Sequence, residues 1–289
     1  MTNKPYIGII GGSGIYELKN LKNTKWIKLE SDYGKPSDEI LTGIIGEVNI
    51  AFLPRHGRSH NLLPSGINYR ANIDCLKKLG ITDIISLSAV GSLKENIKPG
   101  QFIIIDQFID RTIARKKTFF DEGIVAHVSM AKPVSEKLSK IILESASKDI
   151  EIFLGGTYLA MEGPQFSSLA ESELYRTWNC DVIGMTNMPE AKLAREAEIA
   201  YATVAMVTDY DCWHPDHESV TVENIIKILN SNSDNAKNLV SNIIDNINNR
   251  AWKFDDPAYN ALDNAIITPV EARSTQSLNK IRYIAKRVL

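Results

Sequence analysis

Residues 199–207, with the sequence IAYATVAMV, limit the folds open to this chain more than any other stretch. Alanine and β-branched side chains dominate these residues. A run of this length and composition is typical of a strand buried on both faces of a largely parallel sheet. Pro189 suits a first helical position, so a helix is expected from there to about Glu198. A helix followed by a buried strand predicts an α/β fold.

The buried run is followed at once by Thr208-Asp209-Tyr210-Asp211. Open α/β sheets bind ligands just beyond the carboxyl ends of their strands, so two carboxylates at this point indicate a ligand site. A solvated turn, in which an aspartate caps the next element, explains the same residues. Both interpretations stay open at this step.

The charge balance and the cysteines exclude several classes of protein. The 289 residues hold 33 Lys and Arg against 35 Asp and Glu, a formal net charge of −2, so no overall positive field attracts nucleic acid or an anionic membrane. Cys75, Cys180 and Cys212 are odd in number and lack CxxC spacing, which indicates neither a disulfide framework nor a thiolate zinc site. Any anion site must therefore be local.

No linker rich in Pro, Gly or Ser divides the chain. We expect one domain over residues 1–250 and a C-terminal tail, 251–289, whose helix packs on the same domain or on a neighbouring subunit. The apolar run at residues 6–10 is too short for a signal peptide, and eighteen consecutive apolar residues occur nowhere. These observations predict a cytoplasmic protein without a membrane segment.

A glycine-rich turn near the N-terminus is suited to phosphate. Residues 6–10 are typical of a strand, which opens into Gly11-Gly12-Ser13-Gly14. The backbone N–H groups of this turn and the Ser13 hydroxyl could hold a phosphate. A dinucleotide-binding fingerprint is disfavoured, because Glu17 stands where its third glycine should be.

The segment Arg55-His56-Gly57-Arg58-Ser59-His60 follows a predicted hairpin of residues 40–45 and 48–53. Two guanidiniums and an imidazole at a strand end suit a phosphate dianion, because arginine offers paired donors. The spacing of His56 and His60 also suggests a metal site, but no glutamate lies between them and the arginines would repel a cation. Exposed arginines that hold a loop are the alternative interpretation.

Helices and strands are predicted along the rest of the chain. Helices are expected at residues 68–79, 135–148, 168–178, 221–247 with a polar break at 230–234, and 276–288, and strands at 84–87, 102–109 and 153–161. Residues 88–92 are interpreted as a small-residue turn, and residues 110–130 as a long surface loop.

Two side-chain groups outside these elements invite a functional interpretation. Phe166 lies in a Gly-Pro loop at a strand end, where an aromatic ring can stack on a planar heterocycle or plug the core. His214 and His217 stand near Asp211 and suggest a second metal site. Pro215 breaks their regular spacing, and histidines in a solvated loop explain them more simply.

Seven motifs together resemble the trimer-forming branch of the purine nucleoside phosphorylase superfamily, and within it the enzymes that cleave 5′-methylthioadenosine. The motifs are IGIIGGSG (7–14), PRHGRSH (54–60), SAVGSL (88–93), IDQFIDRT (105–112), MEGPQFSS (161–168), GMTNMPE (184–190) and VTDYDCW (207–213). The resemblance covers residues 6–247. It implies a single-domain α/β fold with a central twisted mixed β-sheet flanked by helices, and a homotrimer or a hexamer made of two trimers.

The resemblance also assigns site residues. It implies phosphate contacts from Ser13, Arg55, His56, Ser88, Ala89 and Thr186. It implies substrate contacts from Met185 at the ribose, Phe166 at the base, Asp209, Tyr210 and Asp211 at the purine edge, and His127 at the 5′ substituent of the adjacent subunit. Specificity is expected from Ser167 and from an apolar 5′ pocket of Val222 and Ile226. One departure is Gly184, where some relatives have Asn.

The implied reaction is phosphorolysis of 5′-methylthioadenosine to adenine and 5-methylthioribose 1-phosphate in purine and methionine salvage. Phosphate is a co-substrate, so no metal or organic cofactor is expected. Asp209 and Asp211 are the expected catalytic residues: a protonated Asp209 would donate to N7 of the purine, which requires a raised pKa.

Two alternatives to this activity remain. Relatives that take 6-oxopurines usually have Asn where this chain has Asp209, so a phosphorylase of 6-oxopurine nucleosides or methylthioinosine is the nearer alternative. A nucleotide-binding protein without turnover is the more remote one. The phosphorylase interpretation predicts small-molecule partners, a nucleoside and phosphate, rather than a nucleic acid or a membrane.

Overall fold

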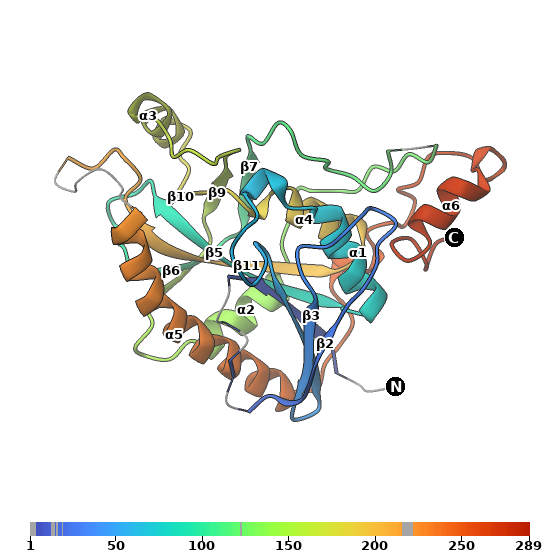
Figure 1. Ribbon diagram of the computed structural model, residues 1–289, viewed down its shortest axis with the longest axis horizontal. Coiled ribbons are helices and arrows are strands. Elements are labelled where there is room, and N and C mark those ends of the chain that lie inside the picture. The colour runs from blue at the N-terminus through green and yellow to red at the C-terminus, as the bar shows by residue number, and fades with distance from the viewer. Residues whose placement is uncertain (1–3, 13–14, 16, 19, 122, 216–221) are drawn as a thin grey trace.

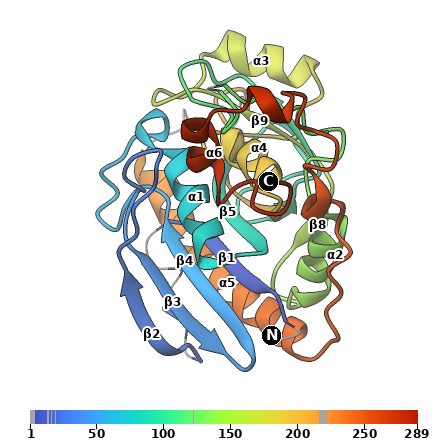
Figure 2. The same ribbon diagram turned by 90° about the vertical axis from the view of Figure 1, so that its right-hand side faces the viewer.

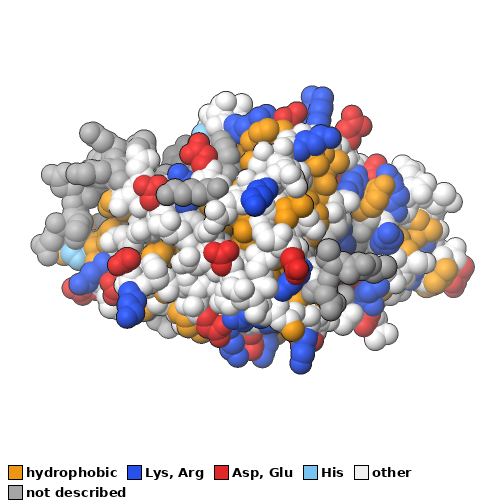
Figure 3. Space-filling view, turned by 90° about the horizontal axis from the view of Figure 1, so that it is seen from below, with side chains coloured by type: hydrophobic (Ala, Val, Ile, Leu, Met, Phe, Trp, Pro, Cys, Tyr) orange, Lys and Arg blue, Asp and Glu red, His pale blue; other side chains and the backbone are white. Residues whose placement is uncertain are grey.

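The computed structural model describes residues 4–12, 15, 17–18, 20–121, 123–215 and 222–289. Helices cover both faces of one mixed sheet, which confirms the predicted α/β class (Figure 1). None of the described helices is both long and apolar enough to cross a membrane. Acidic and basic side chains are interspersed on the face drawn in Figure 3.

The described chain contains eleven strands and six α-helices. The strands are β1 (Tyr6–Gly11), β2 (Lys22–Ile27), β3 (Ile40–Ile45), β4 (Val48–Pro54), β5 (Asp83–Ser92), β6 (Phe102–Ile104), β7 (Gln107–Asp110), β8 (Ile152–Leu154), β9 (Thr157–Ala160), β10 (Val182–Gly184) and β11 (Ala200–Asp209). The α-helices are α1 (Tyr69–Leu79), α2 (Glu136–Ser145), α3 (Leu169–Thr177), α4 (Asn187–Glu196), α5 (Val222–Asn248) and α6 (Thr275–Ile281). Short 3₁₀ helices occur at η1 (Pro64–Gly66), η2 (Pro257–Asn260) and η3 (Val270–Ala272).

The sheet is built around β5. Its main path is β2-β3-β4-β1-β5-β10-β9-β7, and β11, β6 and β8 form a branch that joins at β5. β11 pairs in parallel with β5 and antiparallel with β6, and nine of its ten residues are buried. The sequence-based prediction of a strand buried on both faces is therefore confirmed.

Alternate side chains of the strands enter two separate cores. Ile10 packs with residues of α1 and α4 on one face of the sheet, whereas Ile9 packs with residues of α2 and α5 on the other. This alternation follows from the two-residue period of a strand. Figures 1 and 2 show the two helix pairs on opposite faces, with α3 at one end of the molecule and α6 at the other.

Capping residues stand at both ends of α1 and at the start of α3. The Asn68 side chain accepts a hydrogen bond from the Ala71 N–H at the start of α1, and Gly80 ends this helix with a φ of 88°. A left-handed residue at that position favours glycine, because it has no Cβ. Ser168 and Glu171 form a capping box at the start of α3.

The boundaries of α4 differ slightly from the prediction. Met188 has extended backbone angles, so the regular turns begin at Pro189. The helix ends at Glu196 rather than Glu198, which has a positive φ of 52°. The helix and the buried strand after it are otherwise as predicted.

Two predicted strands, 102–109 and 153–161, are each divided in the structure. Residues 102–104 pair with β11, whereas residues 107–110 pair with β9 in another part of the sheet. The second predicted strand is broken at Gly155 and Gly156, whose φ values are 92° and 157°. The two breaks lie side by side, because the Gly156 N–H donates to the Asp106 side chain over 3.0 Å.

The predicted polar break at residues 230–234 is wrong, because α5 is continuous. Asn232 is buried there, and its side-chain amide donates to the Val207 carbonyl oxygen over 3.1 Å. The tail helix is shorter than predicted and spans Thr275–Ile281, with Ser274 as its N-cap. Residues 110–130 are irregular as expected, but they are not purely a surface loop, because Arg115 and Phe119 are buried.

The tail packs against the rest of the chain. The Tyr259 hydroxyl donates to the Asp83 carboxylate over 2.9 Å, and the Arg287 guanidinium donates to Glu198 over 2.9 Å. Ala126 and Ile266 form an isolated bridge that joins the tail to the irregular segment before α2. The division of the chain at residue 250 stays a prediction.

Candidate active site

The sheet has an opening along one edge of β5. β11 pairs with the other edge as far as Gly91. β1 covers the open edge only up to Ser86, and β10 reaches it from the opposite direction at Ser92 and Gly91. Within the described chain, residues 87–90 therefore have no strand partner on that edge, and the ends of β1 and β10 face each other. Ligands of α/β sheets bind where loops diverge in this way.

Ser88 and Ala89 lie in this opening. They belong to β5, so the predicted turn at residues 88–92 is wrong; the strand continues because β11 pairs along it. Ser88 is buried, whereas Ala89 is exposed in the middle of the sheet. An exposed small residue in a central strand indicates open space above it, which is what close approach of a ligand requires.

Ser88 belongs to a cluster of buried hydroxyl groups. The Ser88 Oγ atom lies 3.2 Å from the Thr186 Oγ1 atom and 3.2 Å from the Tyr158 hydroxyl oxygen. A Cβ atom on Gly184 would collide with that same phenol oxygen. Gly184 is therefore required by Tyr158, which occupies the space that a larger residue would need.

Arg55, directly after β4, has its guanidinium inside the protein. Its Nε and Nη2 atoms donate to the two oxygens of Glu190 over 2.8 and 3.0 Å. Its Nη1 atom donates to the Leu87 carbonyl oxygen over 2.9 Å. Both side chains are 2% exposed. The paired N–H donors of Arg55, which were expected to bind phosphate, are thus bonded to Glu190. One Nη1 hydrogen has no partner among the described residues.

The Glu190 carboxylate is the centre of a buried polar network. Besides Arg55, it accepts hydrogen bonds from the Ser86 hydroxyl over 2.8 Å and the Tyr201 hydroxyl over 2.9 Å. The Asn187 amide donates to both of these hydroxyl oxygens. Although burial acts to lower it, the Glu190 charge raises the pKa of Arg55 above its usual value. This network fixes β4, β5, β11 and α4 beneath the opening.

His56 follows Arg55 and is neutral in this environment. Burial lowers the pKa of His56 from 6.5 to about 4. Its Nδ1 atom lies 2.8 Å from the Leu62 carbonyl oxygen, so Nδ1 carries the proton and Nε2 is an acceptor. Such an imidazole can bond to a protonated phosphate oxygen, not to an unprotonated one. The His60 ring stacks on it with centroids 4.4 Å apart.

Asp209 ends β11 beside the opening. Its Oδ1 atom accepts from the Asp211 N–H over 2.8 Å, and its Oδ2 atom accepts from the Thr208 hydroxyl over 2.6 Å. Burial raises the pKa of Asp209, with a smaller contribution from the Asp211 charge, and this outweighs the two hydrogen bonds. A Cβ atom on Gly91 would lie 2.8 Å from Asp209 Oδ1, so glycine at that position leaves room for the carboxyl group.

Asp211 is more buried than Asp209. It is 8% exposed, has a positive φ of 51°, and its Oδ2 atom has no hydrogen-bond partner among the described residues. Burial raises the pKa of Asp211 as well. Two adjacent carboxyl groups with raised pKa values are a feature of functional sites, because ionising both in a confined space is unfavourable.

The loop after β9, residues 161–168, lies against the segment after β10. A Cβ atom on Gly163 would lie 2.5 Å from the Met185 Sδ atom. Phe166 is 46% exposed and therefore does not plug the core. The Ser167 carbonyl oxygen accepts from the Cys212 thiol over 3.4 Å, which joins this loop to the Asp209–Asp211 segment. Met185 and Ser167 are thus the points at which this loop meets the segments after β10 and β11.

The remaining predicted residues are placed differently. The Tyr210 hydroxyl donates to the Glu95 carbonyl oxygen over 3.3 Å, so its side chain is engaged with the protein. The His127 N–H donates to the Ala265 carbonyl oxygen, which places that segment beside the tail. Ser13 lies outside the described residues, as do the side chains of Val222 and Ile226 in α5.

Sequence reasoning missed four residues of this region: Tyr158, Glu190, Tyr201 and Arg115. Glu190 stands in the GMTNMPE motif and could have been noticed as its only charged residue. Tyr158 and Tyr201 lie in apolar runs, where a tyrosine is indistinguishable from a core side chain. Arg115 lies in an irregular segment rich in basic residues, which resembles a solvated surface.

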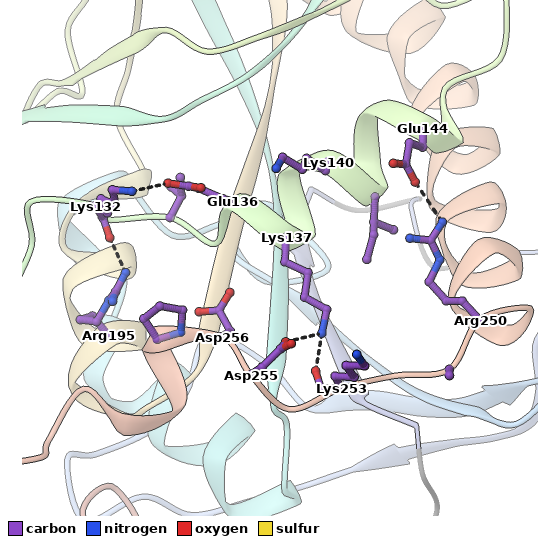
Figure 4. A pocket seen from close by; sticks show the side chains of 14 residues that line it. Lys132, Glu136, Lys137, Lys140, Glu144, Arg195, Arg250, Lys253, Asp255 and Asp256 are labelled. Atoms are coloured by element: carbon purple, nitrogen blue, oxygen red, sulfur yellow. Dashed lines mark hydrogen bonds and ion pairs between the residues drawn. The ribbon is translucent and has the colours of Figure 1, made fainter.

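A separate cavity of about 590 Å³ lies between α2 and the chain around residues 250–257 (Figure 4). It contains none of the predicted site residues. Many of its charged side chains pair with one another: Lys132 with Glu136, Lys137 with Asp255, and Arg250 with Glu144. Among the described residues, three or more His, Cys, Asp or Glu side chains nowhere gather in a way suited to a metal ion.

A family model described as the phosphorylase superfamily matches residues 6–245. The chain belongs to this superfamily. The match covers every strand of the sheet and the whole opening around β5. The motif-based resemblance is thereby confirmed at the level of the superfamily.

Individual relatives are similar over nearly the whole chain. The S-methyl-5′-thioadenosine phosphorylase of Rhodospirillum rubrum is 56% identical, covering 99% of this chain and 98% of the relative. That of Cereibacter sphaeroides is 53% identical, with 99% of each covered. A crystal structure of a methylthioadenosine phosphorylase from an Antarctic soil metagenomic library has a TM-score of 0.91 and 47% identity, covering 98% of this chain and 99% of that one.

A more distant structure is of a complex with a ligand. It is the methylthioadenosine phosphorylase from Schistosoma mansoni in complex with adenine. Its TM-score is 0.83 at 33% identity, covering 91% of this chain and 99% of that one. The fold around the opening is thus shared with a protein whose complex contains the free purine base.

Proposed function

We propose that this chain catalyses phosphorolysis of 5′-methylthioadenosine, which yields adenine and 5-methylthioribose 1-phosphate and serves purine and methionine salvage. The relatives at 56% and 53% identity over the full chain carry the proposal. The geometry agrees with it, because small residues and hydroxyl groups at the opening of β5 stand beside a partly buried carboxyl group with a raised pKa.

The phosphate is proposed to bind at the opening of β5. The Ser88 and Thr186 hydroxyls, the backbone at Ala89, the free Nη1 hydrogen of Arg55 and the Ser13 turn would supply its donors. Glu190 neutralises the charge of Arg55, so these donors act mainly as dipoles rather than as net positive charge. Held beneath the ribose, the dianion stabilises the positive charge that develops at C1′ as the base leaves.

The purine is proposed to bind between Phe166 and the Asp209–Asp211 segment. Phe166 offers an exposed aromatic face for stacking, and Met185 would lie against the ribose. Asp209 in its protonated form donates to N7 of the leaving base and accepts from the 6-amino group. Burial supports the protonated form, because desolvation penalises the carboxylate. Asp211, also with a raised pKa, would keep the carboxyl pair from ionising fully.

Specificity at the 5′ end is proposed to come from Val222 and Ile226, four residues apart in α5, and from Ser167. An apolar pocket favours a methylthio group over a hydroxyl group. Tyr210 would contribute through its backbone, since its hydroxyl is bonded to Glu95. No metal or organic cofactor is proposed, because phosphate itself is the nucleophile.

The assembly is proposed to be a homotrimer or a hexamer of two trimers. Large apolar side chains are exposed near the loop of residues 161–168: Ile113 is 84% exposed and Leu63 60%. Their burial by a neighbouring chain would be favourable. His127 lies on the segment that pairs with the tail, so it is proposed to serve the 5′ end of the adjacent subunit's substrate. A cytoplasmic location stays a prediction.

A substrate panel tests the activity. Release of free base is measured from methylthioadenosine, adenosine, inosine and methylthioinosine, each with and without inorganic phosphate. We expect phosphate-dependent release that is fastest for methylthioadenosine. Preference for inosine or methylthioinosine would assign a 6-oxopurine phosphorylase instead, and no release from any substrate would contradict catalysis.

A further inference from the structure

Arg115 is a buried arginine outside the predicted site. Its side chain is 1% exposed although it belongs to an irregular segment. The guanidinium packs near the Tyr69 ring, with Cζ 5.4 Å from the ring centroid. A buried charge of this kind is unfavourable unless its hydrogens have partners, so the groups that satisfy it have a defined geometry.

Backbone carbonyl oxygens from two different loops accept from its Nη1 and Nη2 atoms, and the side chains of Ser65, Glu162 and Tyr69 supply further acceptors. Nη1 donates to the carbonyl oxygens of Met185 and Met188, each over 2.6 Å. Nη2 donates to the carbonyl oxygen of Glu162 over 2.8 Å and approaches that of Met161 at 3.5 Å. One planar group therefore spans the segment 185–188, which follows β10, and the loop 161–166, which follows β9.

The Glu162 side chain, in turn, joins its own loop to the segment that carries Arg115. Its Oε2 atom accepts from the backbone N–H groups of Ile113 and, over 3.1 Å, Ala114, both beside Arg115. Although partial burial acts to raise it, these bonds and that from Ser65 lower the pKa of Glu162 to about 2. Segment 113–115 and loop 161–166 are thus locked together by reciprocal hydrogen bonds.

The segment that carries Arg115 is also fixed to α4. Asp110 accepts from the Thr112 N–H over 3.0 Å, from Lys117 over 3.0 Å and from Lys192 of α4 over 2.5 Å. Hydrogen bonds from Lys192 and its other partners outweigh burial and lower the pKa of Asp110 to about 2. The segment that carries Arg115 is therefore tied to α4 through Asp110.

We propose that Arg115 is a positioning residue that sets the spacing between the phosphate–ribose half of the site, at Met185 and Thr186, and the base half, at Phe166. This rests on the proposed function, because the two halves are defined by the substrate. A nucleoside spans both halves, whereas adenine occupies only the base half and inorganic phosphate only the other. Arg115 acts on the reaction through the relative position of the loops and touches neither ligand.

The test replaces Arg115 by lysine, which keeps the charge and loses the planar fork that reaches both loops. Binding of adenine alone and of inorganic phosphate alone is measured by calorimetry, and kcat/KM is measured for methylthioadenosine. Because misplacement of a reacting group by about 1 Å can cost 100-fold, we expect kcat/KM to fall by about 30- to 100-fold. Each single-ligand dissociation constant should stay within about threefold of wild type.

The matched control is Arg195→Lys, which alters another buried arginine that donates to a carbonyl oxygen, that of Lys132, away from the opening. This variant should lose thermal stability and keep kcat/KM. If Arg115→Lys does not fold, Glu162→Gln loosens the same junction at a partly exposed position and should show the same pattern more weakly.

Two results would overturn the proposal. If Arg115→Lys changes only the melting temperature, as the control does, Arg115 serves packing alone. If adenine or phosphate binding weakens as much as kcat/KM, Arg115 builds one half of the site rather than spacing the two. Failure of the wild-type protein to turn over the nucleoside would refute the proposed function separately, because the inference is tested by variant-to-wild-type ratios.

Discussion

Asp209→Asn is the substitution that tests base recognition most selectively. The structure predicts that it is tolerated. The side-chain oxygen of Asn can accept from the Asp211 N–H, as Asp209 Oδ1 does over 2.8 Å. Its amide group can donate to the Thr208 hydroxyl oxygen, which lies 2.6 Å from Asp209 Oδ2. Both local bonds survive, so the change should act on the ligand rather than on the fold.

The expected magnitude follows from the groups at the purine edge. A protonated Asp209 offers a donor to N7 and an acceptor to the 6-amino group of adenine. Hypoxanthine has an acceptor at position 6, so the carbonyl oxygen of Asp209 would face O6 without a hydrogen between them. Asn can donate to O6 and accept from a protonated N7. Each buried unpaired group costs about 1–3 kcal/mol, which corresponds to a shift of about 5- to 150-fold in relative specificity.

The assay compares kcat/KM for methylthioadenosine and methylthioinosine in both proteins. The ratio of the two constants cancels any loss of active enzyme. We expect Asp209→Asn to lower turnover of methylthioadenosine and to move the ratio towards methylthioinosine. An equal loss for both nucleosides would show that Asp209 supports catalysis or folding without reading the base.

Three further substitutions test the surroundings of the site. Glu190→Gln leaves the buried Arg55 charge unpaired and should destabilise the protein by about 3–5 kcal/mol in urea unfolding, with partial recovery when Arg55→Met is added; additive losses would contradict coupling. Tyr158→Phe removes the hydroxyl 3.2 Å from Ser88 Oγ and should raise the phosphate KM about fivefold with little change in the nucleoside KM; equal changes would place Tyr158 elsewhere. Burial raises the pKa of Glu196 from 4.5 to about 7, so the stability that its neutral form contributes is complete below pH 4.5 and lost as pH rises through 7. Glu196→Gln should remove up to about 3 kcal/mol of this decline, and an unchanged stability profile between pH 5 and 8 would refute it.

The buried strands and capped helices could be predicted because local chemistry determines them. Alanine and β-branched side chains dominate residues 199–207 on both faces, which is typical of a central strand. Gly80 marks the end of α1 because glycine, which has no Cβ, adopts the left-handed backbone there without strain. The breaks at residues 105–106 and 155–156 could not be predicted, since they depend on which distant strand each half pairs with.

Some residues of the candidate site could likewise be predicted from the sequence, and others could not. Asp209, Ser88 and Thr186 stand beside the ends of strands or in the opening, and motifs indicated them. The pairing of Arg55 with Glu190 could not be predicted, because it joins residues 135 positions apart through the fold. The sequence alone does not show whether an arginine binds a phosphate or a buried carboxylate, because the guanidinium donates to both in the same way. Arg115 could not be predicted for a related reason, because several of its partners are backbone carbonyl oxygens, which no sequence pattern indicates.

The most direct test of the central claim follows phosphorus through the reaction. Purified protein is incubated with methylthioadenosine and inorganic phosphate, and ³¹P NMR is recorded while adenine is quantified in the same sample. The account predicts that the phosphate signal is replaced by a sugar 1-phosphate signal, with one adenine released for each phosphate consumed. Release of adenine without loss of inorganic phosphate would indicate hydrolysis and would contradict phosphorolysis at the opening of β5.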